Sequence, residues 1–366
     1  MSKNKGQSGF GIVELLIATA IIAIVLVMST DVFTIVLAQS RQQTKVVNSE
    51  QQGVAGLRML QYDIEHAGYG LPGRYQNGIN YLEAVAAPAS NYNDSPTGIP
   101  RAIVKGENIG FNGSDYLVVK STVAATSTAA QKWTYIRQGA NPKVWDIDKQ
   151  KLIAGERVIV IKPRSDENSQ NELEMDGATF FTQFNSAFPA TFSPKKTAER
   201  FVIYGVDPST DLRMPFNRAD YYVARPGTGM PPSCAPNTGI LFKATLQHSD
   251  GAFSALPILD CVADMQVAFL LDTNSDGATD TATEDISALT TQQIRETLKE
   301  MRINLLVQEG HKDTSYTHSP AVMPVGDTLF GAFRGSNFDL SATIGTGWQN
   351  YRWKVYKLAI RPQELQ

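Results

Sequence analysis

The sequence is poor in the residues and motifs that enzymes use for catalysis. Its 366 residues include only four histidines and two cysteines. The histidines are scattered, and no H-E-x-x-H, G-x-S-x-G or phosphate-loop motif is present. His311 and His318 are expected in a surface loop. We therefore expect a protein that is not an enzyme.

The sequence also lacks an excess of positive charge. It carries 33 Lys and Arg against 36 Asp and Glu, a formal net charge of -3. Because polyanion binding needs a basic surface, we expect no nucleic-acid partner. A hydrophobic content of 42% with 19% charged residues is typical of a folded protein, and the length fits one large domain or two lobes.

One long hydrophobic run stands near the N-terminus. From Phe10 to Met28 the only charged residue is Glu14, and about 20 apolar residues are enough to span a bilayer. Lys3 and Lys5 precede the run, which predicts a cytoplasmic leader and a main body across the membrane. No good small-residue cleavage site follows the run, so we expect the span to be retained.

Glu14 is the unusual residue of this run. A carboxylate at mid-bilayer costs about 2 to 3 kcal/mol on insertion scales, and less near the interface. Glu14 could be a passive acid that reaches the headgroups or is protonated. The alternative is that Glu14 has a function within the membrane.

The residues around Glu14 favour the second alternative. Gly9, Phe10 and Glu14 in "SGFGIVELLIATAI" resemble the signal of type IV prepilins. The resemblance implies that a prepilin peptidase cuts between Gly9 and Phe10 and that the new N-terminal Phe10 is N-methylated. It also implies that Glu14 pairs with the terminal amine of a neighbouring subunit. Such a pair would fix the register between subunits rather than add much stability.

An amphipathic pattern continues the hydrophobic run. Apolar residues recur at helical spacing and predict one buried stripe: Val46 or Val47, Val54, Leu57, Leu60 and Ile64. Gly53 and Gly56 predict bending or close packing. The pattern stops at "AGYGLPG", residues 67–73, where glycine and proline end a helix. The resemblance implies that this helical half packs against a β-sheet.

The rest of the chain is rich in short strand-like runs. These are expected at residues 116–120, 157–162, 201–206, 220–225, 239–246, 265–271, 303–308 and 351–360. Thr290 and Gln293 form a capping-box pattern that predicts a helix at 291–300. Residues 70–110 and 163–200 are expected to be long loops or an inserted lobe. The four tryptophans, Trp133, Trp145, Trp348 and Trp353, are expected in the core or half-buried in the sheet.

The predicted fold class is α+β, with a long N-terminal helix packed on a β-rich, pilin-like globular domain. Its parts are a cytoplasmic leader (1–9), a transmembrane half-helix (10–38), an amphipathic half-helix (39–67) and a β-rich domain with long insertions (68–366).

Two further stretches narrow the resemblance. "LRMLQYDIEHAGYGLPG" near the helix end and the closing "YRWKVYKLAIRP" are similar to PilW-type minor pilins, relatives of the J-type minor pseudopilins of type II secretion. The resemblance implies a minor pilin that helps to initiate pilus assembly and lies at or near the pilus tip. The alternatives are a pseudopilin of a type II secretion system and a binding module at the tip.

This resemblance also implies partners and a location. The partners are other minor and major pilins, the prepilin peptidase, the inner-membrane assembly platform and the membrane itself. Small residues, Gly11, Ala18, Ala20 and Ala23, would allow helices to associate in the bilayer. The protein is expected in a bacterial inner membrane as a single-pass protein with a periplasmic C-terminus, and then in the extracellular pilus.

A calcium-loop pattern occurs in "LDTNSDGATDTATED", residues 271–285. Asp272, Asn274, Asp276 and Asp280 supply side-chain oxygens, and the carbonyl of Ala278 supplies another. Thr283 stands where a full EF-hand has a bidentate glutamate, with Glu284 and Asp285 next to it. The pattern predicts a structural Ca²⁺ site. The alternative is an ordinary turn rich in Asp, Asn and Gly.

The two cysteines, Cys234 and Cys261, lie 27 residues apart. In a periplasmic chain an even pair is expected to form a disulfide, with two buried thiols as the alternative. A loop of this length would stabilise the fold by roughly 3 to 4 kcal/mol.

Overall fold

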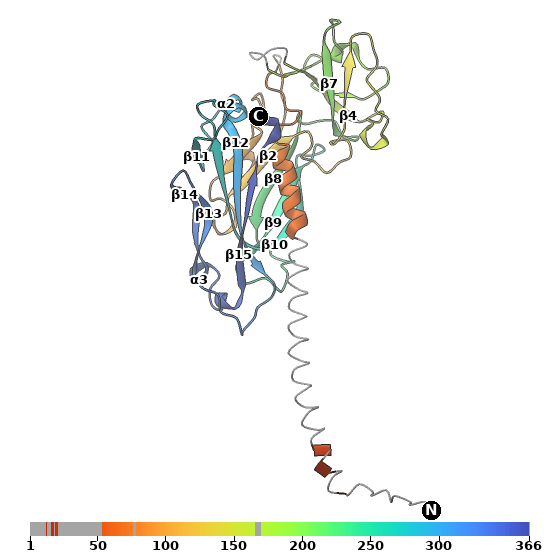
Figure 1. Ribbon diagram of the computed structural model, residues 1–366. Helices are drawn as coiled ribbons and strands as arrows, with labels where there is room; N and C mark the ends of the chain where they lie inside the picture. Colours follow the sequence, from red (N-terminus) through yellow and green to blue (C-terminus); the bar gives the residue numbers. More distant parts are fainter. Residues whose placement is uncertain are drawn as a thin grey trace, which may run out of the picture. The chain divides into compact units, whose positions relative to one another are not determined.

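The computed structural model describes residues 12, 16, 17, 19 and 20, and residues 53–75, 78–164 and 170–365 (Figure 1). The chain forms two compact units, Met1–Glu50 and Gln51–Gln366. In the first unit the five described residues are helical. Most of the predicted span at 10–38 lies outside the described residues. No helix within the described residues is long and apolar enough to cross a bilayer.

The second unit is built on an eight-stranded antiparallel sheet. Its strands follow the order β1-β2-β8-β9-β10-β12-β15, and β11 pairs with β10. Their bounds are β1 Ile103–Gly106, β2 Tyr116–Ser121, β8 Asn217–Ala224, β9 Gly239–Leu246, β10 Phe253–Leu271, β11 Thr281–Thr283, β12 Leu298–Glu309 and β15 Arg352–Ile360.

The long strand β10 holds the two halves of this sheet together. Its residues 253–262 pair with β9, and its residues 262–271 pair with β12. Asp115 joins the first hairpin to the second half of β10: its amide donates to the Met265 carbonyl and its carboxylate accepts from the Val267 amide. Lys105 donates to the Val267 carbonyl at 2.9 Å. The sheet is therefore strongly curved, because its first hairpin returns to β10.

A helix at residues 53–65 packs on one face of this sheet (Figure 1). Leu57, Leu60 and Ile64 are buried in a core shared with the strands. A Cβ on Gly56 would lie 1.9 Å from the carbonyl oxygen of Ile258 on β10, so only glycine permits this approach. The predicted close packing at Gly56 is confirmed. The prediction that Val54 belongs to the buried stripe is wrong, because Val54 is 53% exposed.

A five-stranded lobe is inserted between β2 and β8. Its strands follow the order β3-β7-β4-β5, and β6 pairs with β4. Their bounds are β3 Trp133–Arg137, β4 Arg157–Lys162, β5 Glu172–Leu173, β6 Thr182–Gln183 and β7 Arg200–Asp207. One face carries a small core of its own, and Ile159 and Ile161 on the other face join the main core.

A two-stranded hairpin and a short helix complete the unit. The hairpin, β13 Val322–Leu329 and β14 Ala332–Asp339, covers the sheet face opposite the helix over β10 and β12. Helix α2, Thr291–Thr297, begins with the predicted capping box between Thr290 and Gln293. The remaining short helices are α3 Leu340–Thr343 and the 3-10 turns η1 Ala89–Tyr92, η2 Phe111–Gly113, η3 Asp148–Gln150, η4 Ala190–Phe192, η5 Trp348–Asn350 and η6 Gln363–Leu365.

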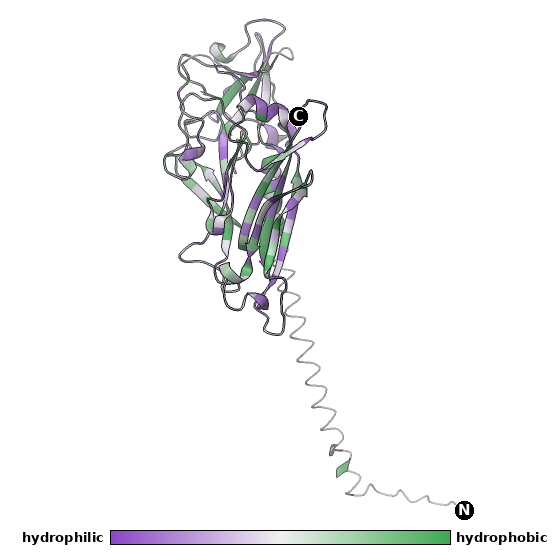
Figure 2. Cartoon of the chain, turned by 90° about the vertical axis from the view of Figure 1, so that its left-hand side faces the viewer, coloured by the Kyte–Doolittle hydropathy of each residue, from purple (hydrophilic) through white to green (hydrophobic). Residues whose placement is uncertain are grey.

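Hydrophobic and hydrophilic bands both occur along the strands of the large sheet (Figure 2). All eight strands predicted from sequence are present, and several extend further than predicted. β1, β3, β5, β6, β11, β13 and β14 were missed. Trp353 is buried as expected, whereas Trp133 is 40% exposed. His311 is exposed as predicted, but His318 is buried beside Trp348, so that prediction is wrong.

Candidate functional site

The junction between the helix and the sheet contains one buried ion pair. Asp63 follows the apolar stripe and is 1% exposed. Its Oδ2 lies 2.5 Å from Nζ of Lys243 on β9 and accepts a hydrogen bond from Tyr221 on β8 at 2.6 Å. Burial raises the pKa of Asp63, and Lys243 opposes that shift. This pair locks the register of the helix on the sheet, because moving the helix would leave two buried charges unpaired.

The opposite face of the sheet buries a larger set of charges under residues 79–98. Lys120 on β2 contacts Glu83 and Asp94, each at 2.7 Å. Arg218 on β8 contacts Glu83 at 3.0 Å and Asp220 at 2.7 Å. Burial opposes ionisation of Asp94, yet Lys120 and Arg101 hold the pKa of Asp94 below its usual value. The segment 79–98 is therefore fixed to the sheet by paired charges.

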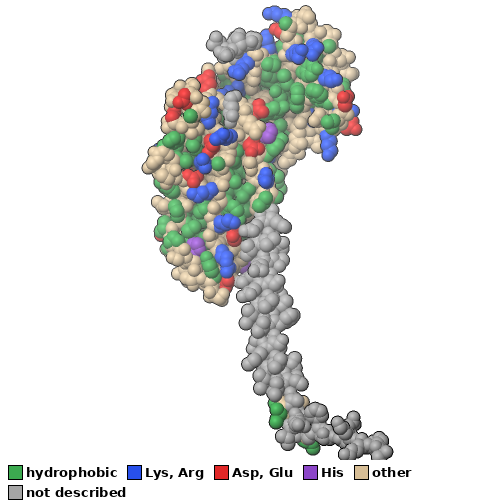
Figure 3. All heavy atoms as spheres, in the orientation of Figure 1, with side chains coloured by type: hydrophobic (Ala, Val, Ile, Leu, Met, Phe, Trp, Pro, Cys, Tyr) green, Lys and Arg blue, Asp and Glu red, His purple; other side chains and the backbone are tan. Residues whose placement is uncertain are grey.

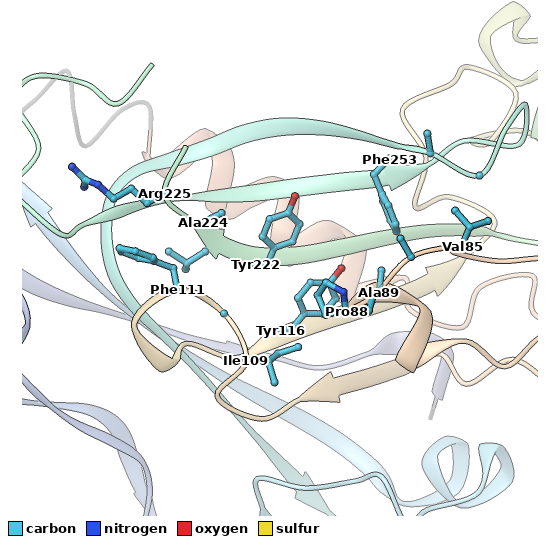
Figure 4. A pocket seen from close by; sticks show the side chains of 16 residues that line it. Val85, Pro88, Ala89, Ile109, Phe111, Tyr116, Tyr222, Ala224, Arg225 and Phe253 are labelled. Carbon is cyan, nitrogen blue, oxygen red and sulfur yellow. The ribbon is translucent and has the colours of Figure 1, made fainter. Parts of the chain in front are cut away.

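Stacked aromatic rings extend across the same face. The rings of Tyr92, Tyr116, Tyr222 and Phe242 follow one another at centroid distances of 5.4, 5.4 and 5.9 Å. The Tyr116 hydroxyl donates to Asp220 at 2.6 Å. The stack thus joins the charged cluster to an apolar groove beside it (Figure 4).

The predicted calcium loop is a tight turn between β10 and β11. Asp272 is 2% exposed, and its carboxylate accepts hydrogen bonds from the amides of Asp276 and Gly277. Gly277 has φ +88, as the predicted sharp turn requires. Asp280 accepts from the amides of Thr273 and Asn274.

The oxygens of this loop therefore face amide donors of the loop itself. Within the described residues, no group of three or more acidic, histidine or cysteine side chains converges in a way that could hold a metal. The arrangement is that of an Asx-rich turn, and calcium binding by Asp272, Asn274, Asp276, Ala278 and Asp280 stays a prediction.

Cys234 and Cys261 form the predicted disulfide, with their Cα atoms 5.0 Å apart. The bridge ties the segment before β9 to the middle of β10. Cys261 has φ 55, at the irregular stretch where the pairing of β10 passes from β9 to β12. The disulfide therefore holds the chain at the bend of the sheet.

The lobe carries exposed aromatic and aliphatic side chains that the sequence did not reveal. The ring centroids of Trp133 and Trp145 are 5.0 Å apart, and those of Tyr135 and Trp145 are 6.1 Å apart. Val144 and Ile147 are 62% and 57% exposed. Figure 3 shows hydrophobic side chains gathered on this lobe.

The predicted processing and assembly residues, Gly9, Phe10 and Glu14, lie outside the described residues. Their identification depends on comparison with known proteins. Residues 4–30 match the family model described as the prokaryotic N-terminal methylation motif. The chain carries a prepilin-type N-terminal signal. No curated protein and no solved structure matches the chain.

This match confirms the prepilin signal predicted from the sequence. It indicates a type IV pilin-like prepilin or pseudopilin, which implies processing by a prepilin peptidase and assembly with other pilins. The prepilin signal is also consistent with a membrane-anchored and then pilus-associated location.

Proposed function

We propose that this prepilin is a minor type IV pilin that helps to initiate pilus assembly and lies at or near the pilus tip. The observation that carries the proposal is the methylation motif at residues 4–30, followed along the chain by a compact unit of residues 51–366. A unit of this size, with an inserted lobe, is difficult to repeat along a filament shaft. This favours a component present in few copies.

The buried helix–sheet contact supports an assembly role. When the subunit is pulled or packs against a neighbour, force on the helix is transmitted to the sheet at two places. Asp63 transmits it to β9, and the close contact at Gly56 transmits it to β10. A helix fixed in this way gives the globular unit one defined orientation relative to its own helix at residues 53–65. A pilus subunit needs such an orientation to pack against its neighbours in one register.

In this proposal prepilin peptidase cuts after Gly9, and Glu14 becomes the fifth residue of the mature chain. Glu14 then pairs with the terminal amine of a neighbouring subunit and sets the axial register. Gly11, Ala18, Ala20 and Ala23 allow neighbouring helices to approach.

A clean deletion tests the proposal, scored in the same cells for surface pili by electron microscopy and for exoproteins by gel. Loss of pili with normal secretion, restored by the wild-type gene, supports the minor pilin. Normal pili with trapped exoproteins would instead identify a pseudopilin of type II secretion. If both were normal, the assembly role would be wrong and binding at the tip would become the leading proposal.

Substitution of Glu14 tests the register role in cells that make pili. We expect Glu14→Leu to be processed but to enter filaments at a strongly reduced level. Glu65→Leu, which changes a partly exposed glutamate of the described helix, is the matched control. Normal incorporation of Glu14→Leu would exclude the register role.

Binding at the tip is the second candidate function. The cluster of Trp133, Trp145 and Tyr135 on the lobe favours it, because Trp133 is 40% exposed and exposed apolar patches mark interaction surfaces. If binding to a surface depends on this cluster, Trp133→Ala should reduce adhesion of piliated cells without reducing the number of pili. Unchanged adhesion would remove this candidate.

The calcium prediction is tested on the purified full chain by isothermal titration. A weak site in the loop should release or absorb heat at millimolar Ca²⁺ and should lose the signal in Asp272→Asn. Asp250→Asn, in the exposed turn between β9 and β10, is the control. An absence of heat at millimolar Ca²⁺ would leave the loop as a turn only.

A further inference from the structure

An apolar groove lies on the sheet face opposite the helix. It encloses about 690 Å³ and is lined by residues 85–89, 109–111, 222–225 and 251–253, together with Tyr116. Ligand pockets of proteins commonly have volumes of about 300 to 1,000 Å³. The groove is therefore large enough for a small-molecule ligand.

The groove has one charged residue. Among its sixteen lining residues, Arg225 is charged, and the others are aliphatic, aromatic, proline or glycine. The rings of Tyr116 and Tyr222 stack at 5.4 Å with an interplanar angle of 5° and form part of its wall. Small residues such as Ala224 and Ala252 leave the space open. The lining thus suits a hydrocarbon and offers a cation at one place.

The groove is elongated, with its charge at one end. Figure 4 shows Phe253 and Val85 at one end, Arg225 and Phe111 at the other, and the two tyrosines between them. Phe253 lies against Arg218 on β8, with the guanidinium carbon 5.9 Å from the ring. Arg225 follows Arg218 by seven residues, so the ends are about 23 Å apart along the strand.

Arg225 is placed to bind an anion. One of its guanidinium nitrogens donates to the Thr238 carbonyl, which holds the side chain beside the end of β8. Within the part of the chain that the structure describes, no carboxylate lies within ion-pair distance of Arg225. Arg–carboxylate contacts are often bidentate and are among the stronger hydrogen bonds of proteins.

The apolar rim is exposed. Val85 is 72% exposed and Ile109 is 44% exposed, on opposite loops beside the groove. A ligand chain lying in the groove would cover both side chains. The hydrophobic effect would then favour binding by roughly 25 cal/mol per Å² of apolar surface removed from water.

We propose that this groove binds a long-chain aliphatic carboxylate, with its hydrocarbon chain between the loops and its carboxylate on Arg225. The assignment rests on three features: the apolar lining, the length along β8 and the single cation at one end. This binding site is independent of the prepilin signal and goes beyond the proposed role in assembly.

The test uses the full chain in lipid nanodiscs and a palmitate analogue with a diazirine in its chain. After irradiation, adducts are mapped by mass spectrometry of peptides. We expect adducts on peptides that contain residues 85–89, 109–111 or 251–253, and competition by unlabelled palmitate. The matching photoreactive alcohol has the same chain without the anion and should label these peptides about tenfold less at equal concentration.

Two kinds of groove variant, each with a matched control, distinguish the contribution of the ligand's hydrocarbon chain to binding from that of its carboxylate. Ala224→Trp fills the groove between Tyr222 and Arg225 (Figure 4) and should abolish labelling, and Ala252→Trp at the rim should reduce it if Ala224→Trp does not fold. Arg225→Gln should reduce acid labelling about tenfold and leave alcohol labelling unchanged. Leu256→Trp and Arg137→Gln alter exposed residues that do not line the groove, so labelling should stay at the wild-type level.

The outcomes decide between the parts of the proposal. Adducts spread over peptides outside the groove, or labelling that persists in both groove tryptophan variants, would overturn it. Equal labelling by the acid and the alcohol, with no effect of Arg225→Gln, would exclude a carboxylate ligand. Labelling that only a phospholipid competes away, and palmitate does not, would also overturn it.

Discussion

On one face of the large sheet, the helix at residues 53–65 buries leucine and isoleucine side chains and a single ion pair. On the other face, residues 79–98 cover Lys120, Arg218 and Asp220. Glu83 belongs to the covering segment, and all four side chains are nearly or fully buried. The first face is held mainly by apolar packing, and the second is held in large part by paired charges. Shortening a buried apolar side chain lowers the free energy of unfolding in proportion to the atoms removed and the cavity left. Removing one partner of a buried ion pair leaves an unpaired charge and lowers it strongly.

The largest effect should come from the charged face. Arg218→Met leaves Glu83 and Asp220 with fewer cationic partners in a buried site, and we expect the free energy of unfolding to fall by about 3 to 5 kcal/mol. Urea unfolding of the full chain, followed by tryptophan fluorescence, measures the change.

Arg361→Met is the control for this substitution. Arg361 also pairs with a carboxylate, Glu300, but its side chain is 74% exposed. Exposed pairs contribute about 0 to 1 kcal/mol. Equal losses in the two variants would mean that the buried network is not a principal support of this face.

On the helix face, Leu60→Ala should lower the free energy of unfolding by about 3 kcal/mol, because Leu60 is fully buried between the helix and the strands. Val54→Ala, six residues away on the same helix, should cost less than about 0.5 kcal/mol because Val54 is 53% exposed. The same unfolding assay measures both. Similar losses for the two would contradict the observed orientation of the helix.

These two faces also differ in how far the sequence predicts them. The helix face follows from local spacing: Leu57, Leu60 and Ile64 recur at three and four residues, and the structure buries all three. Val54 fits the same spacing and is exposed, because the glycines at 53 and 56, rather than Val54, meet β10. Periodicity identifies a stripe but does not fix which end of the stripe meets the sheet.

The charged face could not be predicted, because its partners are far apart in sequence. Glu83 and Arg218 are separated by 135 residues, and nothing local in "YLEAVAA" marks Glu83 as buried. Lys120 in "YLVVKS" has the spacing of an outward-facing strand residue, yet it is fully buried. The groove depends on the same long-range arrangement of loops and strands. The β13–β14 hairpin was not predicted because Pro324 and Gly335 interrupt its strand patterns.

A titrating group at the end of the large sheet gives the third prediction. His248 is buried; its Nδ1 accepts from the Arg213 amide, and its Nε2 lies 3.1 Å from the Asn217 side-chain oxygen, which suits a neutral ring. Burial lowers the pKa of His248 to about 4, against about 6.5 in the unfolded chain. The unfolded state therefore binds a proton first as the pH falls.

Stability from this group is complete above pH 6.5 and is lost as the pH falls toward 4. Between pH 7.5 and pH 4.5 we expect His248 to account for a loss of about 2.5 kcal/mol. The measurement is the difference between wild type and His248→Gln in unfolding free energy at the two pH values. An identical pH dependence in both proteins would mean that His248 titrates normally in the fold.

The smallest effect concerns Asp264, which is compared with Asp63, a buried aspartate on the other face. Asp63 faces the helix contact and pairs with Lys243, whereas Asp264 lies under the β13–β14 hairpin and accepts hydrogen bonds from Ser336 and Gln266. Among the described residues no cation lies within ion-pair distance of Asp264, and burial raises the pKa of its carboxyl. The serine and glutamine contacts partly oppose that shift.

For Asp264 the folded state therefore favours the protonated form, and its ionised form lowers stability above the unfolded pKa of about 3.9. Asp264→Asn removes that charge and keeps the shape, so the free energy of unfolding at pH 7 should change by less than about 1 kcal/mol. Asp63→Asn leaves Lys243 buried without its anion and should cost about 3 kcal/mol. If Asp264→Asn cost as much as Asp63→Asn, Asp264 would have to be held by a cation as Asp63 is.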